Sequence, residues 1–338
     1  VRHCLNLKVM RKKFAILGVL ILLLAGALGI FYCWRAPETE DVVWGVSFSQ
    51  KQAAALGLDW PVVYSALLND LGAKKIRIAA HWDLLAPRPG EYDFSDLDRQ
   101  MDEAARAGAK TVLVIGMKTP RWPECHLPEW AKTLDKERQQ TAVLAMLETA
   151  VIRYRDHPAL EFWQVENEPL FPFGECPWRD EKFLQKEIAL VKSLDGNKRP
   201  VVISDSGEGS WWFNAANAGD IAGITMYRRV YFSELGIYVD YLLPPAFYAF
   251  KAELVGLLFK KRVVCVELQA EPWAIGQKYD GGANDAETMD IDRFRENVAF
   301  ARNTGLDEFY LWGGEWWYWM KAKKDRPEFW EEAKTLFN

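Results

Sequence analysis

The sequence is poor in the residues that bind metals and carry redox chemistry. Its 338 residues include five cysteines and four histidines, without a Cys-x-x-Cys pair or a His-Glu-x-x-His motif. Zinc sites and thioredoxin-like redox sites depend on such closely spaced pairs. The sequence therefore indicates neither class of protein, and we expect no metal and no cofactor.

Acidic residues outnumber basic ones outside the N-terminal segment. The chain has a formal net charge of -5, although residues 1–37 contain six basic residues and no acidic one. The remainder is acidic and poorly suited to displacing counterions from a phosphate backbone, so we expect no nucleic-acid partner. Hydrophobic residues, in contrast, make up 50% of the chain and include 16 tryptophans, which is enough for a large folded core.

One long uncharged run lies near the N-terminus. Residues 14–34 contain no charged side chain, and a helix of that length spans about 30 Å, the thickness of the hydrocarbon core of a bilayer. Basic residues at 11–13 precede it and predict a cytoplasmic N-terminus. A cleaved signal peptide is the alternative, because residues 25–27 (Ala-Gly-Ala) have the small-x-small form of a cleavage site. The apolar run continues beyond that site, which favours an uncleaved anchor.

These features divide the chain into four parts. We expect a basic cytoplasmic tail, a transmembrane anchor, a short linker and one folded domain, which are residues 1–13, 14–34, 35–42 and 43–338 respectively. With or without cleavage, the folded domain lies outside the cytoplasm, in a periplasm or at a cell surface.

Short apolar, β-branched runs alternate with helical patterns along the folded domain, which predicts an α/β fold with a parallel sheet. Eight such runs are found, at residues 43–48, 75–80, 111–116, 160–165, 201–204, 221–226, 263–266 and 308–311. Eight βα units in about 300 residues fit a single (β/α)8 TIM barrel. An open doubly wound sheet is the alternative, but it requires a glycine-rich turn after the first strand, and residues 48–51 (Phe-Ser-Gln-Lys) do not form one.

Carboxylates follow two of the predicted strands. Strand 160–165 is followed by Glu166, Asn167 and Glu168, and then by a proline that ends the strand. Burial of Glu168 would hold its carboxyl group neutral, as a general acid requires, whereas a solvated loop acid is the alternative. Glu267 directly follows strand 263–266, while Glu271 lies further into the loop, where we expect a solvated side chain.

These motifs, taken in order, resemble those of the clan A (β/α)8 retaining glycoside hydrolases, in forms seen in cellulase-like and β-galactosidase-like families. Such enzymes carry an Asn-Glu acid/base at the end of strand four and a Glu nucleophile at the end of strand seven. Asn167-Glu168 matches the first motif and Glu267 matches the second. The segment 81–98 is similar to the second βα loop of the clan.

The resemblance also implies substrate-binding residues. Arg77 matches the strand-two arginine near the nucleophile, Tyr227 the strand-six tyrosine that hydrogen-bonds it, and Trp312 the strand-eight aromatic beneath the reacting sugar. Asn167 is expected to contact the sugar 2-hydroxyl. Further candidates for substrate contact at strand ends and in the following loops are His81, Trp82 and Trp273. Three basic residues near the same loops, which we expect to be solvated surface charges, are Lys118, Arg121 and Arg228.

Two cysteines fall in the loops after strands three and four, which are neighbours in a barrel. Outside the cytoplasm Cys125 and Cys176 can form a disulfide, and we predict that they do.

The sequence thus predicts a membrane-anchored, extracytoplasmic retaining glycoside hydrolase that acts on an oligosaccharide or polysaccharide. Two alternatives remain open. A catalytically silent carbohydrate-binding barrel would have no use for two opposed carboxylates, whereas a transglycosylase would use the same residues with a sugar in place of water as the acceptor.

Overall fold

The computed structural model describes residues 41–232, 235–273 and 279–337, together with residues 13, 14, 18, 19, 26 and 29. The expected tail, anchor and linker therefore fall almost entirely outside the described residues. Within the described part of the chain, no helix is both long enough and apolar enough to cross a bilayer.

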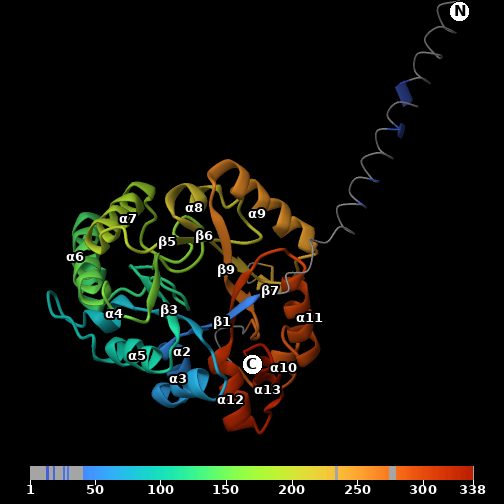
Figure 1. The fold of residues 1–338 in the computed structure, drawn as a ribbon, viewed down its shortest axis with the longest axis horizontal. Coiled ribbons are helices and arrows are strands. Elements are labelled where there is room, and N and C mark those ends of the chain that lie inside the picture. The colour runs from blue at the N-terminus through green and yellow to red at the C-terminus, as the bar shows by residue number, and fades with distance from the viewer. Residues whose placement is uncertain are drawn as a thin grey trace, which may run out of the picture.

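Eight parallel strands close into a barrel that helices surround (Figure 1). The strands are β1 Val43–Phe48, β2 Lys75–Ala79, β3 Lys110–Ile115, β4 Leu160–Val165, β5 Val201–Asp205, β6 Ile221–Met226, β9 Arg262–Gln269 and β10 Glu308–Trp312. Their order around the barrel is β1-β10-β9-β6-β5-β4-β3-β2. Each strand is almost wholly buried because the barrel interior covers one face and helices cover the other. The predicted (β/α)8 barrel is confirmed.

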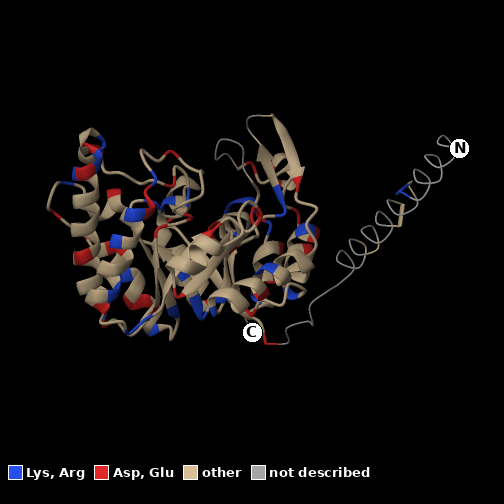
Figure 2. Ribbon diagram, turned by 90° about the horizontal axis from the view of Figure 1, so that it is seen from above, with Lys and Arg blue, Asp and Glu red and all other residues tan. Residues whose placement is uncertain are grey.

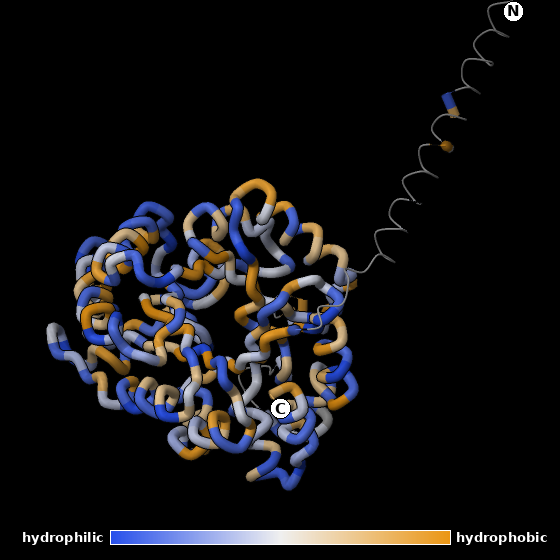
Figure 3. Tube along the Cα trace, in the orientation of Figure 1, coloured by the Kyte–Doolittle hydropathy of each residue, from blue (hydrophilic) through white to orange (hydrophobic). Residues whose placement is uncertain are grey.

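The outer layer consists of helices that follow the strands. They are α2 Gln50–Ala55, α3 Trp60–Asn69, α4 Trp82–Leu85, α5 Ser95–Arg106, η1 Glu129–Thr133, α6 Lys136–Tyr154, α7 Glu181–Asp195, α8 Phe213–Ala218, α9 Pro245–Phe259, α10 Ala283–Ala286, α11 Ile291–Arg302, α12 Gly314–Lys324 and α13 Glu328–Lys334. Figure 3 shows hydrophobic and hydrophilic residues alternating along these helices, as expected where one face packs on the sheet.

Aspartate side chains begin three of the longer helices. Asp135, Asp180 and Asp290 each accept a hydrogen bond from the backbone N–H three residues further on, which satisfies a donor that the first turn leaves free. These caps start α6, α7 and α11 and so set where the preceding loops end.

A two-stranded antiparallel hairpin, β7 Arg229–Phe232 and β8 Ile237–Asp240, was not expected from the sequence. It follows β6 and projects beyond the carboxyl end of the barrel (Figure 2). Its strands have four residues each and are only partly buried, and each contains a short apolar run, Val230–Phe232 in β7 and Ile237–Val239 in β8.

Candidate active site

A cavity of about 680 Å³ lies at the carboxyl ends of the barrel strands. The charged side chains that line it are Glu124, Glu168, Glu208, Glu267, Glu271 and Arg121. The carboxyl ends of the strands are where the active sites of (β/α)8 enzymes lie. Both predicted catalytic glutamates therefore face one cavity.

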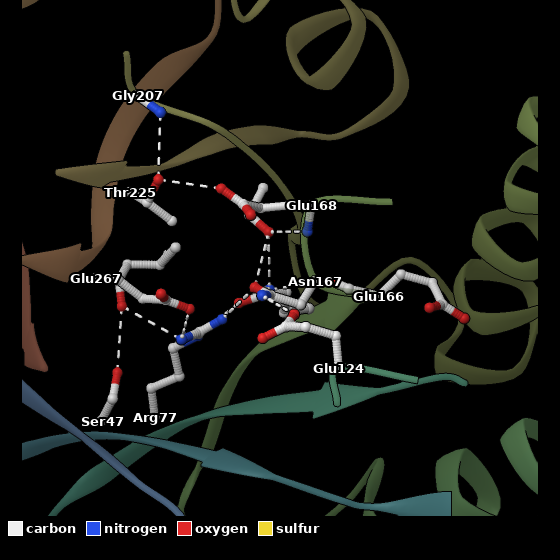
Figure 4. Close-up of polar contacts among 12 residues, drawn as sticks. Ser47, Arg77, Glu124, Glu166, Asn167, Glu168, Gly207, Thr225 and Glu267 are labelled. Atoms are coloured by element: carbon white, nitrogen blue, oxygen red, sulfur yellow. Dashed lines mark hydrogen bonds and ion pairs between the residues drawn. The ribbon is translucent and has the colours of Figure 1, made fainter. Parts of the chain in front are cut away.

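Glu267 is buried and held on both carboxylate oxygens. Arg77, from β2, donates from Nη1 to Glu267 Oε1 at 2.9 Å, and the Tyr227 hydroxyl donates to Oε2 at 2.8 Å (Figure 4 shows the arginine). Burial, with Glu267 as a neighbouring charge, raises the pKa of Tyr227 well above its ordinary value, so this hydroxyl keeps its proton and remains a donor. The structure thus brings together the three residues that the resemblance had grouped. Because β9 continues to Gln269, Glu267 lies within the strand and not just after it.

Glu168 lies on the opposite side of the cavity in an unusual backbone conformation. Its φ is 43°, in the left-handed region that non-glycine residues seldom adopt, and such strain is concentrated at functional sites. The backbone is held there because its N–H donates to Ser204 Oγ at 2.8 Å and its carbonyl accepts from Lys118 Nζ at 2.9 Å. The side-chain Oε1 accepts from the Thr225 hydroxyl at 3.0 Å (Figure 4).

Burial keeps Glu168 protonated at neutral pH. Desolvation, followed by repulsion from Glu267 and from Glu124, raises the pKa of Glu168 to about 8. The Glu168 carboxyl group is therefore a proton donor at neutral pH. Glu267, in contrast, is paired with the Arg77 guanidinium. The solvated-acid alternative for Glu168 does not hold, because the residue is 7% exposed.

Asn167 connects the two sides of the site. Its Oδ1 accepts from Arg77 Nη2 at 2.8 Å, and its Nδ2 donates to Glu124 Oε2 at 2.9 Å. Arg77 is further fixed by a hydrogen bond from Nε to Gln164 Oε1, also 2.8 Å. The Arg77 guanidinium therefore binds Glu267, the nucleophile candidate, and also Asn167, the residue that precedes the acid/base candidate Glu168.

Glu124 is a third buried carboxylate in the cavity, and sequence reasoning missed it. Burial raises its pKa to about 7. It comes from the loop after β3, well beyond the end of the strand, and no recognisable motif precedes it. The loop path that turns Glu124 inward is a property of the folded chain.

Three of the predicted substrate-binding residues, Arg77, His81 and Trp82, do not line the cavity. His81 is buried and its ring nitrogens contact Thr119 Oγ1 at 2.9 Å and Ser49 Oγ at 3.1 Å, so it links three loops. Trp82 is fully buried and packs edge-on against Trp130. Neither side chain lines the cavity, because β2 ends at Ala79 and the chain then turns into α4, which begins at Trp82.

The expectation of solvated charges was also wrong for Arg121 and Glu271. Arg121 is buried and donates to both Glu271 oxygens, and its Nη2 donates to Glu315 Oε2 at 3.0 Å. Its guanidinium also lies 3.9 Å from the centre of the Trp312 ring. Lys118 is likewise buried, with its ammonium on backbone carbonyls. The ion pairs of Arg121 with Glu271 and Glu315 fix the wall of the cavity beside Trp312.

The remaining predicted contacts, Asn167, Tyr227, Trp273 and Trp312, all line the cavity. The predicted disulfide is confirmed: Cys125 and Cys176 are bonded, with Cα atoms 5.2 Å apart. Among the residues that the structure describes, no group of three or more His, Cys, Asp or Glu side chains is arranged to hold a metal ion.

Comparison with known proteins adds independent information. Residues 65–185, which carry Arg77, Asn167 and Glu168, match a family model described as β-galactosidase. A β-galactosidase of Arthrobacter sp is 30% identical over 164 aligned positions, covering 40% of this chain and 24% of that protein. A mannan endo-1,4-β-mannosidase A of Emericella nidulans is 30% identical over 110 positions, covering 32% of this chain and 28% of that protein. The resemblance to glycoside hydrolases is confirmed.

These alignments span about a quarter of the length of the two relatives. Solved structures support the fold over more of the chain. An exo-β-1,4-mannosidase from Opitutaceae bacterium strain TAV5 superposes with a TM-score of 0.59 at 14% identity, over 88% of this chain and 59% of that one. An endo-β-1,4-mannanase from Thermotoga petrophila gives a TM-score of 0.56 at 16% identity, over 89% of this chain and 77% of that one. These solved structures therefore share the (β/α)8 fold of this chain.

Proposed function

We propose that this protein is a retaining glycoside hydrolase whose acid/base is Glu168 and whose nucleophile is Glu267. The observation that carries the proposal is the contrast between two glutamates in one cavity. Glu168 is kept protonated by burial and like charge, with a pKa of about 8, whereas Glu267 is bound by the Arg77 guanidinium and the Tyr227 hydroxyl. A proton donor that faces an anchored nucleophile across one cavity is what acid-assisted displacement requires.

In the first step Glu168 donates its proton to the glycosidic oxygen while Glu267 attacks the anomeric carbon, which forms a glycosyl-enzyme ester and releases the leaving sugar. Ester formation removes the negative charge of Glu267. Since that charge is one of the causes that raise the pKa of Glu168, the pKa of Glu168 falls once the ester has formed. The resulting carboxylate accepts a proton from water as the water attacks the same carbon, and Glu267 leaves as a carboxylate.

The cellular setting and substrate belong to the same proposal. The uncharged run at residues 14–34, with basic residues only on its N-terminal side, supports a single-pass anchor and a catalytic domain outside the cytoplasm. The disulfide is consistent with an oxidising compartment. Such an enzyme would act on an envelope or exported glycan, and the named relatives make β-galactosides and β-mannans the first substrates to test.

The decisive experiment is turnover by matched variants. A fragment that begins at residue 38 is screened against aryl β-glycosides and envelope polysaccharides, beside Glu168→Gln, Glu267→Gln and the control Glu91→Gln, which changes an exposed glutamate in the loop between α4 and α5. We expect the control to match the parent and both cavity variants to lose hydrolysis of natural glycosides. Full activity of either cavity variant on a natural glycoside would refute the mechanism.

The assay also addresses the alternatives. A silent carbohydrate-binding barrel would bind glycans without turnover in any variant. A transglycosylase would show the same dependence on Glu168 and Glu267 but would form longer products when sugar acceptors are supplied.

A further inference from the structure

Aromatic rings form a connected series from the nucleophile to the surface. The Tyr227 hydroxyl donates to Glu267, and the Tyr227 ring contacts the edge of Trp273 with centroids 5.3 Å apart. Trp273 contacts Phe173 at 6.2 Å, and Phe173 contacts Trp122 at 5.9 Å. All four rings line the cavity, and the outermost, Trp122, is 44% exposed. The series is longer than a single pyranose ring.

The two outer rings are held in place by the backbone around them. Trp122 comes from the loop after β3 and Phe173 from the loop after β4, and the Cys125–Cys176 disulfide joins these loops. The backbone N–H of Glu175 also donates to the carbonyl of Pro123 at 3.0 Å.

The two loops also touch at Gly174. Its φ is +93°, and a Cβ added there would lie 2.6 Å from Glu124 Cβ, so the close approach requires glycine. Trp122 is therefore exposed on a rigid support.

We infer that Trp122 and Phe173, here called the rim aromatics, form a distal sugar-binding subsite, so that the enzyme acts on a glycan longer than a disaccharide. The inference rests on the proposed function, because it takes the cavity between Glu168 and Glu267 as the place where the bond is cleaved. A flat aromatic face matches the apolar face of a pyranose ring. Because the rim aromatics are continuous with the cavity, we take their occupant to be a further sugar of the glycan that is bound in the cavity.

Another exposed tryptophan provides a contrast. Trp211 is 61% exposed but does not line the cavity. Because isolated exposed apolar side chains are common on protein surfaces, Trp211 carries no such inference. Trp122 differs in its place on the cavity wall, in its ring contact with Phe173 and in the covalent link between the loops that support it.

The experiment measures binding apart from turnover. Linear β-1,4-manno-oligosaccharides and cello-oligosaccharides, from disaccharide to hexasaccharide, are titrated calorimetrically into the full-length Glu168→Gln protein in detergent. In the series that binds, we expect affinity to rise with chain length. Adding Trp122→Ala should lower the affinity for the longest glycan by about three- to tenfold and reduce the length dependence, whereas the matched Trp211→Ala should leave both unchanged.

Two further variants separate the aromatic face from loop folding. Trp122→Phe keeps an aromatic face and should retain most of the length dependence, and Cys176→Ser keeps Trp122 but frees its support and should lose part of it. Affinity independent of chain length in both series, or equal behaviour of Trp122→Ala and Trp211→Ala, would overturn the subsite. Length-dependent binding without any hydrolysis by the parent chain would support the subsite while refuting the proposed function.

Discussion

The pH dependence of hydrolysis tests the assignment of Glu168 most directly. The acid form of Glu168 is the active one, so raising the pH through its pKa of about 8 removes the proton that the leaving group needs. About nine-tenths of the enzyme is protonated at about pH 7 and about one-tenth at about pH 9, so kcat/KM for a natural glycoside should fall about tenfold between the plateau and about pH 9. The alkaline limb of the profile of kcat/KM against pH should therefore report the deprotonation of Glu168.

A conservative change nearby should move that limb in a known direction. The negative charge of Glu124 is one of the causes that raise the pKa of Glu168. Glu124→Gln removes this charge but keeps an acceptor for Asn167 Nδ2, so deprotonation of Glu168 becomes easier and the limb moves to lower pH. Because the buried carboxyl groups interact, the limb reports a macroscopic pKa of the cluster.

The assay is kcat/KM across pH for the parent and Glu124→Gln, with a natural glycoside and with an aryl glycoside whose leaving group needs no proton. The aryl substrate is the internal control, because its reaction should lose most of the alkaline limb. Glu91→Gln, which changes an exposed glutamate, should leave the limb in place. An alkaline limb of equal size for both substrates, or no movement of the limb in Glu124→Gln, would refute the role of Glu168 as the buried acid.

Four further predictions concern this site and the loops around it. Glu267→Ala should abolish turnover, and azide should restore it with inverted product, since the anion attacks from the vacated face. The carboxyl groups of Glu168 and Glu267 should lie about 5–5.5 Å apart, as in retaining pairs. Arg121→Met should lower the free energy of unfolding by about 3–5 kcal/mol in denaturant titrations, because it leaves two buried carboxylates without their cation. Reduction of Cys125–Cys176, which spans 51 residues, should cost about 2–4 kcal/mol by the same measurement, and an unchanged midpoint would contradict it.

The barrel could be predicted because its strands carry a local signal. Three predicted strands, 43–48, 160–165 and 221–226, have the observed bounds, and the other five differ by a few residues at their ends. Buried parallel strands read as apolar runs in any sequence. The β7–β8 hairpin also contains short apolar runs, Val230–Phe232 and Ile237–Val239, but they fall outside the alternation of strand and helix from which the barrel is predicted.

The site was only partly predictable, because loop paths decide what enters the cavity. Glu168 follows β4 closely and Glu267 lies near the carboxyl end of β9, so their place on the barrel follows from strand order. Glu124 and Arg121 lie in a loop after β3 in positive-φ conformations (72° and 87°), which local sequence does not indicate. The same uncertainty explains why strand order predicts a substrate contact at Trp82, shortly after β2, although this side chain does not line the cavity.

The end of β4 shows how three consecutive polar residues are given separate tasks. Glu166 and Glu168 both have positive φ, 60° and 43°, so the chain there departs from the alternation of an extended strand. Glu166 turns away from Glu168 and Glu267 (Figure 4). Its carboxylate accepts the backbone N–H groups of Met117 at 2.8 Å and Lys118 at 2.5 Å. The Lys118 ammonium in turn donates a hydrogen bond to the Glu168 carbonyl, so the loop that Glu166 holds also holds the backbone of Glu168. Asn167, between them, is left to bind Arg77. The two left-handed residues are therefore what allow one strand end to anchor a loop, bind the arginine that holds the nucleophile and direct a protonated carboxyl group into the cavity.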